Sequence, residues 1–232
     1  MHHAVKWRLI ALNPADACEA PRPDKTEMEV FNAEEVRQLL TLIRDHEDEA
    51  IIKTALFTGM RQGELLGLRW RDVDLDQKVL HVQQTVGRLP KVGFVFRPCP
   101  KNKRSRRLIA LPEIVISALK KHKKLKATEE LKAEKYAEHN LVFCTPAGEP
   151  LDPSALGRRF KALAQQMHRP KMRFHDLRHT HATMLFSQGV HPKIVQERLG
   201  HETISITLDT YSHVQPGMQE EAVARLENLF KK

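Results

Sequence analysis

RFHDLRHTHAT, residues 173–183, places three histidines and two arginines within eleven positions. Because residues three and four apart share one face of a helix, we expect His175, Arg178 and His179 to project together. His181 falls on the opposite, apolar face, so we expect it to be buried or to support other residues. The shared face suits either a metal site, which would use the histidines, or a phosphate site, which would use the arginines as well.

The metal alternative takes His175 and His179 as two ligands one helical turn apart. The pair lacks the glutamate of an HExxH motif, and the cation of Arg178 lies between the two ligands. Arginine instead offers a fixed fork of donors to phosphate oxygens, and a histidine one turn away can donate to the same phosphate or move a proton. The stretch therefore favours phosphate. A second metal-like stretch, DVDLDQ at residues 72–77, lacks the glycine and the final glutamate of a calcium loop, so we expect a polar turn there.

A second candidate phosphate ligand lies in TGMRQGELLGL, residues 58–68. Arg61 follows the helix-ending glycine of this stretch, and Glu64, three residues on, is placed to hold its guanidinium group. The alternative is an ordinary surface ion pair worth ~0–1 kcal/mol. Two arginines together would suit the negative charge that develops on a pentavalent phosphorus.

A nucleophile must come from elsewhere in the chain, which contains two tyrosines. Tyr136 lies in a charged stretch, and we expect it to be exposed and inert. Tyr211 follows shortly after RLGHETISIT, residues 198–207. A phenol with a pKa of ~10 attacks phosphorus only beside cations or a base. The groups that would supply this field are Arg61, Arg178, His175 and His201, with Lys101 as the proton donor to the departing oxygen.

The composition supports a folded, basic protein. Of the 232 residues 41% are hydrophobic, enough for a core, and the formal net charge of +9 suggests a polyanionic partner. The alternative is a basic soluble protein without such a partner, and the positions of the charges distinguish the two possibilities. They gather in several separate segments, which favours a nucleic-acid backbone as the partner. The candidate DNA contacts are Lys103, Arg104, Arg106, Arg158, Arg159 and His179.

The hydrophobic pattern and the turn residues predict an α+β fold that is mostly α-helical. A helix is expected after Asn32, which with Glu35 forms a capping box, and another is expected to end at Gly59. Three β-leaning stretches, residues 78–86, 93–98 and 106–112, predict a small three-stranded antiparallel sheet with the lysine-rich segment as a turn. A further short strand is expected at residues 141–145. The other expected helices are residues 4–12, 50–58, a short one after Arg61, 112–126, 154–167, 175–188, 192–199, about 204–209 and 217–230.

Five stretches, in this order, resemble the sequence boxes of the tyrosine recombinases, also called the phage-integrase family, over about residues 31–229. They are TGMRQGELLGLRWRDVD, PKNKRSRRLIAL, HDLRH, LGH and TYSH. The resemblance identifies Lys101, rather than Lys103, as the catalytic lysine, although Ala110 stands where many relatives have proline. The style of the boxes is similar to integrases of prophages and integrative conjugative elements, with chromosome-dimer resolvases next. The remaining positions carried over are Arg61 with its companion Glu64, His175, Arg178, His201 and Tyr211.

The resemblance implies a mechanism and partners. Tyr211 would attack a DNA phosphate, form a 3′-phosphotyrosyl bond and release a 5′-hydroxyl, which later reseals a strand. No cofactor, metal or nucleotide is implied. The implied partner is double-stranded DNA at specific attachment sites, bound by a homo-tetramer that exchanges its C-terminal helix, residues 217–230. A directionality factor or a DNA-bending protein is a candidate further partner, and the implied place is the bacterial cytoplasm, at the nucleoid.

The resemblance also divides the chain. Residues 1–20 are similar to the end of a core-binding domain cut from a longer chain, residues 21–30 are expected to be a linker, and residues 31–232 form the catalytic domain with its tail helix. The three cysteines show no disulfide pattern, and no apolar run is long enough to predict a membrane span. Three other functions remain as alternatives: a catalytically silent DNA-binding module, a relaxing topoisomerase and a histidine-metal hydrolase.

Overall fold

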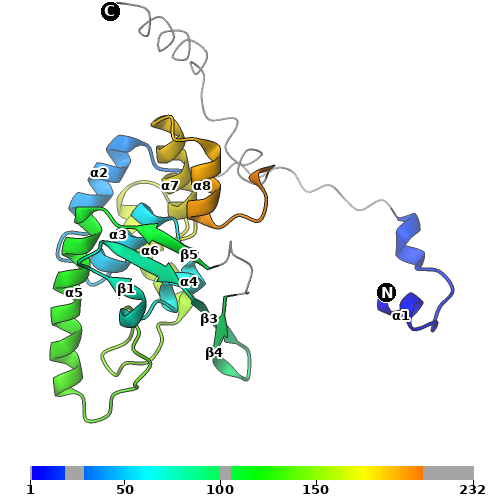
Figure 1. Ribbon diagram of the computed structural model, residues 1–232, viewed down its shortest axis with the longest axis horizontal. Coiled ribbons are helices and arrows are strands. Elements are labelled where there is room, and N and C mark those ends of the chain that lie inside the picture. Colours follow the sequence, from blue (N-terminus) through cyan, green and yellow to red (C-terminus); the bar gives the residue numbers. More distant parts are fainter. Residues whose placement is uncertain (1, 19–28, 100–105, 206–232) are drawn as a thin grey trace, which may run out of the picture.

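The computed structural model of the chain describes residues 2–18, 29–99 and 106–205 (Figure 1). The expected linker, apart from Glu29 and Val30, lies outside these residues. So do Lys101, Lys103 and Arg104, the expected helix at residues 217–230, and all but the first two residues of the one expected at about 204–209.

Helices are the predominant secondary structure of the described chain, as the sequence predicted (Figure 1). Asn32 begins the second of them as expected: its side chain accepts from the backbone N–H of Glu35 at 2.9 Å, and Glu35 returns the bond at 2.8 Å. None of the helices in the described ranges has the length and apolar content that crossing a membrane requires. The helices are α1 (His2–Lys6), α2 (Ala33–Leu42), α3 (Glu49–Thr58), α4 (Gln62–Leu66), α5 (Glu113–Lys132), α6 (Pro153–Gln166), α7 (Asp176–Ser187) and α8 (Pro192–Leu199), with 3₁₀ turns η1 (Pro14–Ala17) and η2 (Trp70–Asp72).

The first helix is shorter than predicted. It ends at Lys6 instead of continuing to residue 12, because Arg8 adopts a left-handed backbone with a φ of 57° and Leu9 N–H turns back to the Ala4 carbonyl at 2.8 Å. Trp7 and Leu9 remain exposed. Short helices depend on packing for their stability, and no buried apolar face prolongs this one.

The three-stranded antiparallel sheet is confirmed, but one of its strands, Val73–Asp74, was not predicted, and the predicted strand at residues 93–98 is not part of it. Its order is β1 (Val73–Asp74), β2 (Val79–Val82), β5 (Arg107–Ala110), and a separate pair joins β3 (Gln84–Leu89) to β4 (Gly93–Pro98). The predicted strand at residues 78–86 therefore divides at Gln83. It divides because β3 turns away to lie on α4, where Gly67 leaves room for it: an added Cβ there would lie 3.0 Å from the Gln84 carbonyl oxygen. The strands on either side of the lysine-rich segment, β4 and β5, thus belong to different sheets and are not one hairpin.

The predicted strand at residues 141–145 is also wrong. Only isolated bridges form there, between Arg69 and Leu141 and between Cys144 and Pro150. Side chains of α5 take the carbonyls that a neighbouring strand would need: the His122 ring contacts the Val142 oxygen at 2.8 Å, and Lys126 donates to the Cys144 oxygen at 2.7 Å.

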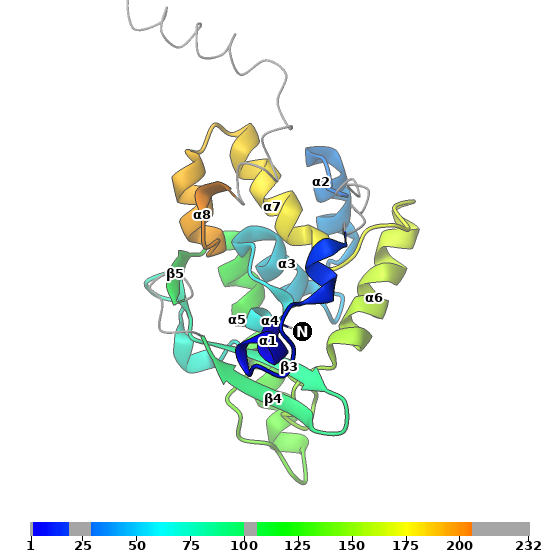
Figure 2. The same cartoon turned by 90° about the vertical axis from the view of Figure 1, so that its right-hand side faces the viewer.

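The fold brings several element ends together. Helix α3, with Ile52 and Leu56 fully buried, packs against both α5 and α7, and α8 lies beside α7 (Figures 1 and 2). The β3–β4 pair lies at the opposite end of the molecule from α7 and α8 in both views. Helices α3 and α8 both end in a left-handed glycine, Gly59 with a φ of 65° and Gly200 with a φ of 68°. The candidate site is built on these two ends.

Candidate active site

Arg61 stands at the N-terminus of α4, immediately after the turn that ends α3. Its backbone N–H donates to Glu64 Oε2 at 2.8 Å and its Nη1 donates to Glu64 Oε1 at 3.1 Å, so the expected pairing is present. Its Nη2 donates to the Gly200 carbonyl at 3.2 Å. The side chain is 43% exposed, so the held guanidinium still reaches solvent.

Arg178 is buried in the first turn of α7, with 4% of its surface exposed. Its Nη1 donates to the Gly59 carbonyl at 2.6 Å and its Nη2 to the Leu199 carbonyl at 2.8 Å. These oxygens belong to the C-terminal ends of α3 and α8, where free carbonyl groups concentrate the negative pole of each helix. Two helix ends therefore hold this cation.

Glu64 also accepts hydrogen bonds from a second arginine, which the sequence did not indicate as part of the site. Arg107 of β5 donates from Nη1 to Oε1 at 3.0 Å and from Nη2 to Oε2 at 2.8 Å. Burial favours the neutral acid, but the hydrogen bonds and charge of Arg107, and then of Arg61, outweigh it and lower the pKa of Glu64 to about 2. The alternation of β5 could have revealed Arg107, because it shares the inward face with buried Ile109.

The histidines surround these arginines and are held in their neutral form. Burial, then the charges of Arg178 and Arg61, lower the pKa of His201 to about 4. Partial burial of the ring, and then the charge of Arg178, also lower the pKa of His175 at the N-terminus of α7. His179 lies edge-on to His175, with ring centroids 5.2 Å apart, and its pKa falls to about 4 through burial and that neighbour. A neutral imidazole keeps one donor and one acceptor nitrogen.

His181 is buried as predicted, with 3% exposure. Its Nδ1 lies 2.9 Å from the Leu56 carbonyl, and Arg198 Nε donates to its Nε2 at 3.1 Å. Tyr136, in contrast, is not exposed as predicted. It is half-buried, and its hydroxyl lies 3.5 Å from Cys144 Sγ, so burial and this contact raise the pKa of the phenol.

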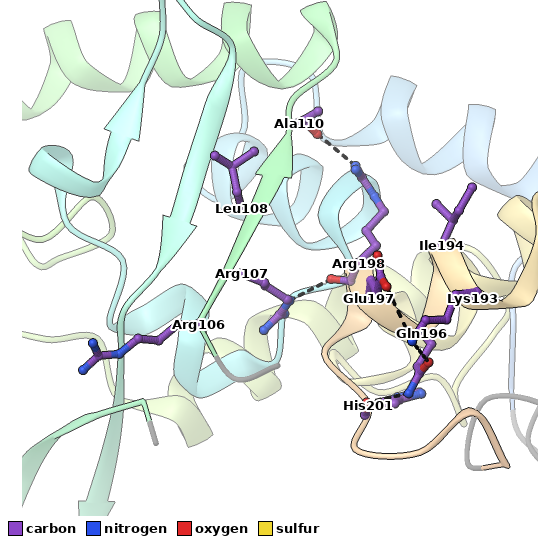
Figure 3. Close-up of a pocket in the computed structure, with 10 residues that line it drawn as sticks. All are labelled: Arg106, Arg107, Leu108, Ala110, Lys193, Ile194, Gln196, Glu197, Arg198 and His201. Carbon is purple, nitrogen blue, oxygen red and sulfur yellow. Dashed lines mark hydrogen bonds and ion pairs between the residues drawn. The ribbon is translucent and has the colours of Figure 1, made fainter. Parts of the chain in front are cut away.

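The candidate DNA contacts occupy different surroundings. Arg106 and Arg158 are exposed. Arg159 is engaged by Asp48 through two bonds, Nε to Oδ2 and Nη2 to Oδ1, both 2.7 Å. Arg106 lies at a cavity of about 500 Å³ between β5 and α8, and its side chain points away from Arg198 (Figure 3).

The structure thus gathers Arg61, Glu64, Arg178 and the three histidines of the site. Lys101 and Tyr211 lie outside the described residues. No group of three or more histidine, cysteine, aspartate or glutamate side chains placed to hold a metal ion occurs in residues 2–18, 29–99 and 106–205.

Comparison with known proteins points to one family. A sequence model of the phage integrase family matches residues 29–218. The chain is 35% identical over 246 aligned residues to the tyrosine recombinase XerC-like protein of Caldanaerobacter subterraneus subsp. tengcongensis, covering 99% of this chain and 63% of that protein. It is 28% identical to the ICEBs1 integrase of Bacillus subtilis, covering 98% and 62%. The chain therefore spans less than two thirds of these relatives.

Solved structures share the fold. The Tn1549 transposon integrase, solved in complex with a circular intermediate DNA, superimposes with a TM-score of 0.76 at 23% identity, over 98% of this chain and 75% of that one. XerA recombinase superimposes with a TM-score of 0.65 at 24% identity, over 86% of this chain and 66% of that one.

Proposed function

Because the chain belongs to the phage integrase family, we propose that it performs site-specific DNA recombination by cutting and rejoining strands through a covalent 3′-phosphotyrosyl bond. One observation supports this most directly. Consecutive carbonyls at the end of α8, those of Leu199 and Gly200, accept from Arg178 and Arg61, so both guanidinium groups are held at one helix end. A single phosphate group placed there would meet two forks of donors.

The proposed reaction balances without an outside energy source. The Tyr211 oxygen attacks phosphorus, the bond from phosphorus to the 5′ oxygen breaks, and the departing oxygen takes a proton from Lys101. His175, kept neutral by its surroundings, accepts the phenol proton. A 5′-hydroxyl from a partner duplex then attacks the phosphotyrosyl bond and releases Tyr211. Because one ester replaces another, no nucleotide is required as an energy source. In this proposal the two arginines, and not a metal ion, offset the charge on the phosphorane.

The described residues have distinct roles in this proposal. Arg61 and Arg178 stabilise the charge that develops on the phosphorane. Glu64 and Arg107 fix the orientation of Arg61, and His201 donates to a phosphate oxygen. These groups are positioned before substrate arrives, which is the condition for strong electrostatic stabilisation of a transition state.

Double-stranded DNA at attachment sites is the proposed substrate, and its backbone would be followed by the remaining basic residues. Arg106 and Arg158 are exposed and form no ion pair with a carboxylate of the described residues, so they suit phosphate contacts, together with Lys103, Arg104 and His179. Arg159 would contribute less to DNA binding, because the Asp48 carboxylate offsets its charge.

The proposed assembly is a homo-tetramer on two duplexes, joined through the segment 217–232, with residues 31–232 as the catalytic domain and residues 1–20 as part of a core-binding domain. A directionality factor or a DNA-bending protein would act with it, in the bacterial cytoplasm. The mass of the complex formed on attachment-site DNA tests the number of subunits.

Trapping of the covalent intermediate tests the reaction itself. Duplexes that the chain binds are selected from a random pool, nicked beside the cleavage position and incubated with the chain in EDTA. We expect an adduct that survives denaturation, with none in Tyr211→Phe and an undiminished amount in Tyr136→Phe, which removes the other phenol.

Each alternative function predicts a different outcome. An adduct that persists in Tyr211→Phe contradicts the assigned nucleophile. Binding without any adduct indicates a silent DNA-binding module, and metal-dependent cleavage without an adduct indicates a hydrolase. Relaxation of supercoiled plasmid without strand exchange between duplexes indicates a topoisomerase.

A further inference from the structure

Arg198, in the last turn of α8, connects that helix to three other elements. Its Nε donates to His181 Nε2 on α7 at 3.1 Å. Its Nη2 donates to the Phe57 carbonyl in the last turn of α3 at 2.9 Å and to the Ala110 carbonyl of β5 at 3.0 Å. Its own carbonyl accepts from Arg107 Nε at 2.7 Å, and Figure 3 shows this bond and the one to Ala110.

His181 extends the connection to α3. A carbonyl only accepts hydrogen bonds, so Nδ1, 2.9 Å from the Leu56 oxygen, carries the ring proton and Nε2 is left to accept from Arg198. The charged groups that act on this ring are Arg198 of α8 and Arg178 of its own helix, and with burial they keep it neutral. One neutral imidazole therefore joins α3, α7 and α8.

The two residues after Arg198 hold the arginines of the candidate site. Leu199 O accepts from Arg178 at 2.8 Å, and Gly200 O accepts from Arg61 at 3.2 Å. The other acceptor of Arg178, Gly59 O, lies two residues beyond Phe57. The Arg178 guanidinium lies between the Gly59 carbonyl of α3 and the Leu199 carbonyl of α8. Arg198 thus links the two helix ends that carry these carbonyls.

The C-terminal ends of α3 and α8 pack so closely that no atom can be added between them. A Cβ added to Gly59 would lie 2.5 Å from Leu199 Cδ2 and 2.7 Å from His181 Cδ2. Any change in the approach of α8 to α3 would therefore move the Leu199 and Gly59 carbonyls relative to each other.

We propose that Arg198 and His181 form a positioning pair that sets the separation of the α3 and α8 ends and thereby the placement of the two phosphate-binding arginines. The inference rests on the proposed function. Neither residue is proposed to touch DNA; both act through the carbonyls of Gly59, Leu199 and Gly200.

The variant Arg198→Lys keeps the positive charge but removes the guanidinium group that bonds to His181, Phe57 and Ala110 at once. At saturating DNA we expect adduct formation to slow by about 100-fold, the usual effect of misplacing a catalytic group by about 1 Å, with DNA affinity changed less than about 3-fold. On a duplex with a neutral methylphosphonate at the cleavage position, the penalty should shrink to less than about 10-fold, because less charge has to be stabilised. A merely structural defect would slow both substrates equally, and that result, or no slowing at all, would overturn the inference.

Arg169→Lys is the matched control. Arg169 is also half-buried and is held by two carboxylates, Glu29 and Glu35, and by the Val30 carbonyl at 3.1 Å, at the start of α2. We expect wild-type adduct rates on both substrates for this variant. A loss as large as that of Arg198→Lys would show that the effect is not specific to the positioning pair.

A second measurement does not depend on cleavage. In the DNA-free chain, the guanidinium N–H signals of Arg178 should be slowly exchanging in side-chain NMR spectra of the wild type and Arg169→Lys. They should shift or exchange rapidly in Arg198→Lys and in His181→Asn, which keeps a short donor toward Leu56 but removes the Nε2 acceptor. Unchanged Arg178 signals contradict the positioning pair, whereas a wild-type chain that forms no adduct contradicts the proposed function.

Discussion

Glu64 shows how far one residue can depart from its simplest sequence interpretation. A glutamate three residues after an arginine is usually part of a surface ion pair of small energy. Here the residue is 3% exposed, and its side chain accepts from Arg61 and, through two further bonds, from Arg107. The single carboxylate thereby orients Arg61 and ties it to Arg107 of the sheet.

Replacing that carboxylate should be costly. Glu64→Gln keeps the shape but leaves two guanidinium groups close together without their counter-ion, so we expect the free energy of unfolding to fall by about 3–5 kcal/mol. Urea unfolding at pH 7 measures it. Glu34→Gln, which breaks only an exposed pair with Arg37, should change the value by less than about 0.5 kcal/mol. Equal effects of the two variants would contradict the buried role of Glu64.

At the scale of the element, the C-terminal ends of α3 and α8 hold the Arg178 guanidinium in place. The left-handed glycines that stop α3 and α8 turn their last carbonyls toward Arg178, and Gly59 has a φ of 65° that other residues adopt with strain. The same residue allows His181 and Leu199 to approach within a distance that a Cβ would prevent.

Gly59→Ala should therefore be destabilising for two reasons, strain in the left-handed region and overlap with Leu199 and His181. We expect a loss of more than about 2 kcal/mol, measured by thermal or urea unfolding. The control is Gly157→Ala within α6, where an added Cβ meets no heavy atom within 4 Å. There we expect neutrality or a gain of up to about 1 kcal/mol, because alanine favours a helix interior. A destabilised control with a tolerated Gly59→Ala would contradict this account.

Helix boundaries were predictable from the sequence where the residues at the boundary determine them locally. Asn32, Gly59 and Pro192 mark helix boundaries through their own chemistry, and the structure confirms each. The strands were less predictable, because the division at Gln83 depends on β3 meeting α4. The site shows the same contrast: the sequence indicated Arg61 and Glu64 together, but the partners of Arg198 lie on carbonyls 88 and 141 residues away in the chain.

At the scale of the whole molecule, the stability of the fold depends on several histidines remaining neutral. Burial lowers the pKa of His122 and of four others near the site, to about 4 for His179 and His201 and to about 3 for His181. Between these values and the ordinary 6.5, the unfolded chain binds more protons than the folded one. The folded state is therefore favoured above about pH 6.5 and loses stability as the pH falls.

The prediction is a fall in the urea midpoint from pH 7 to pH 5. Glu64 does not contribute to it, because a carboxyl with a lowered pKa loses its stabilising effect only below its ordinary value of 4.5 and toward about 2. His179→Gln should flatten the slope, since one of the depressed groups is removed. A midpoint that stays constant over this interval would contradict the protonation states assigned to the site.

The grip on Arg178 has a consequence for how a substrate is captured. The carbonyls of Gly59 and Leu199 hold the guanidinium in one orientation in the DNA-free chain. Fixing an arginine side chain costs about 1.5–2 kcal/mol of rotamer entropy. Folding has already met this cost, so an arriving phosphate keeps a correspondingly larger share of its binding free energy.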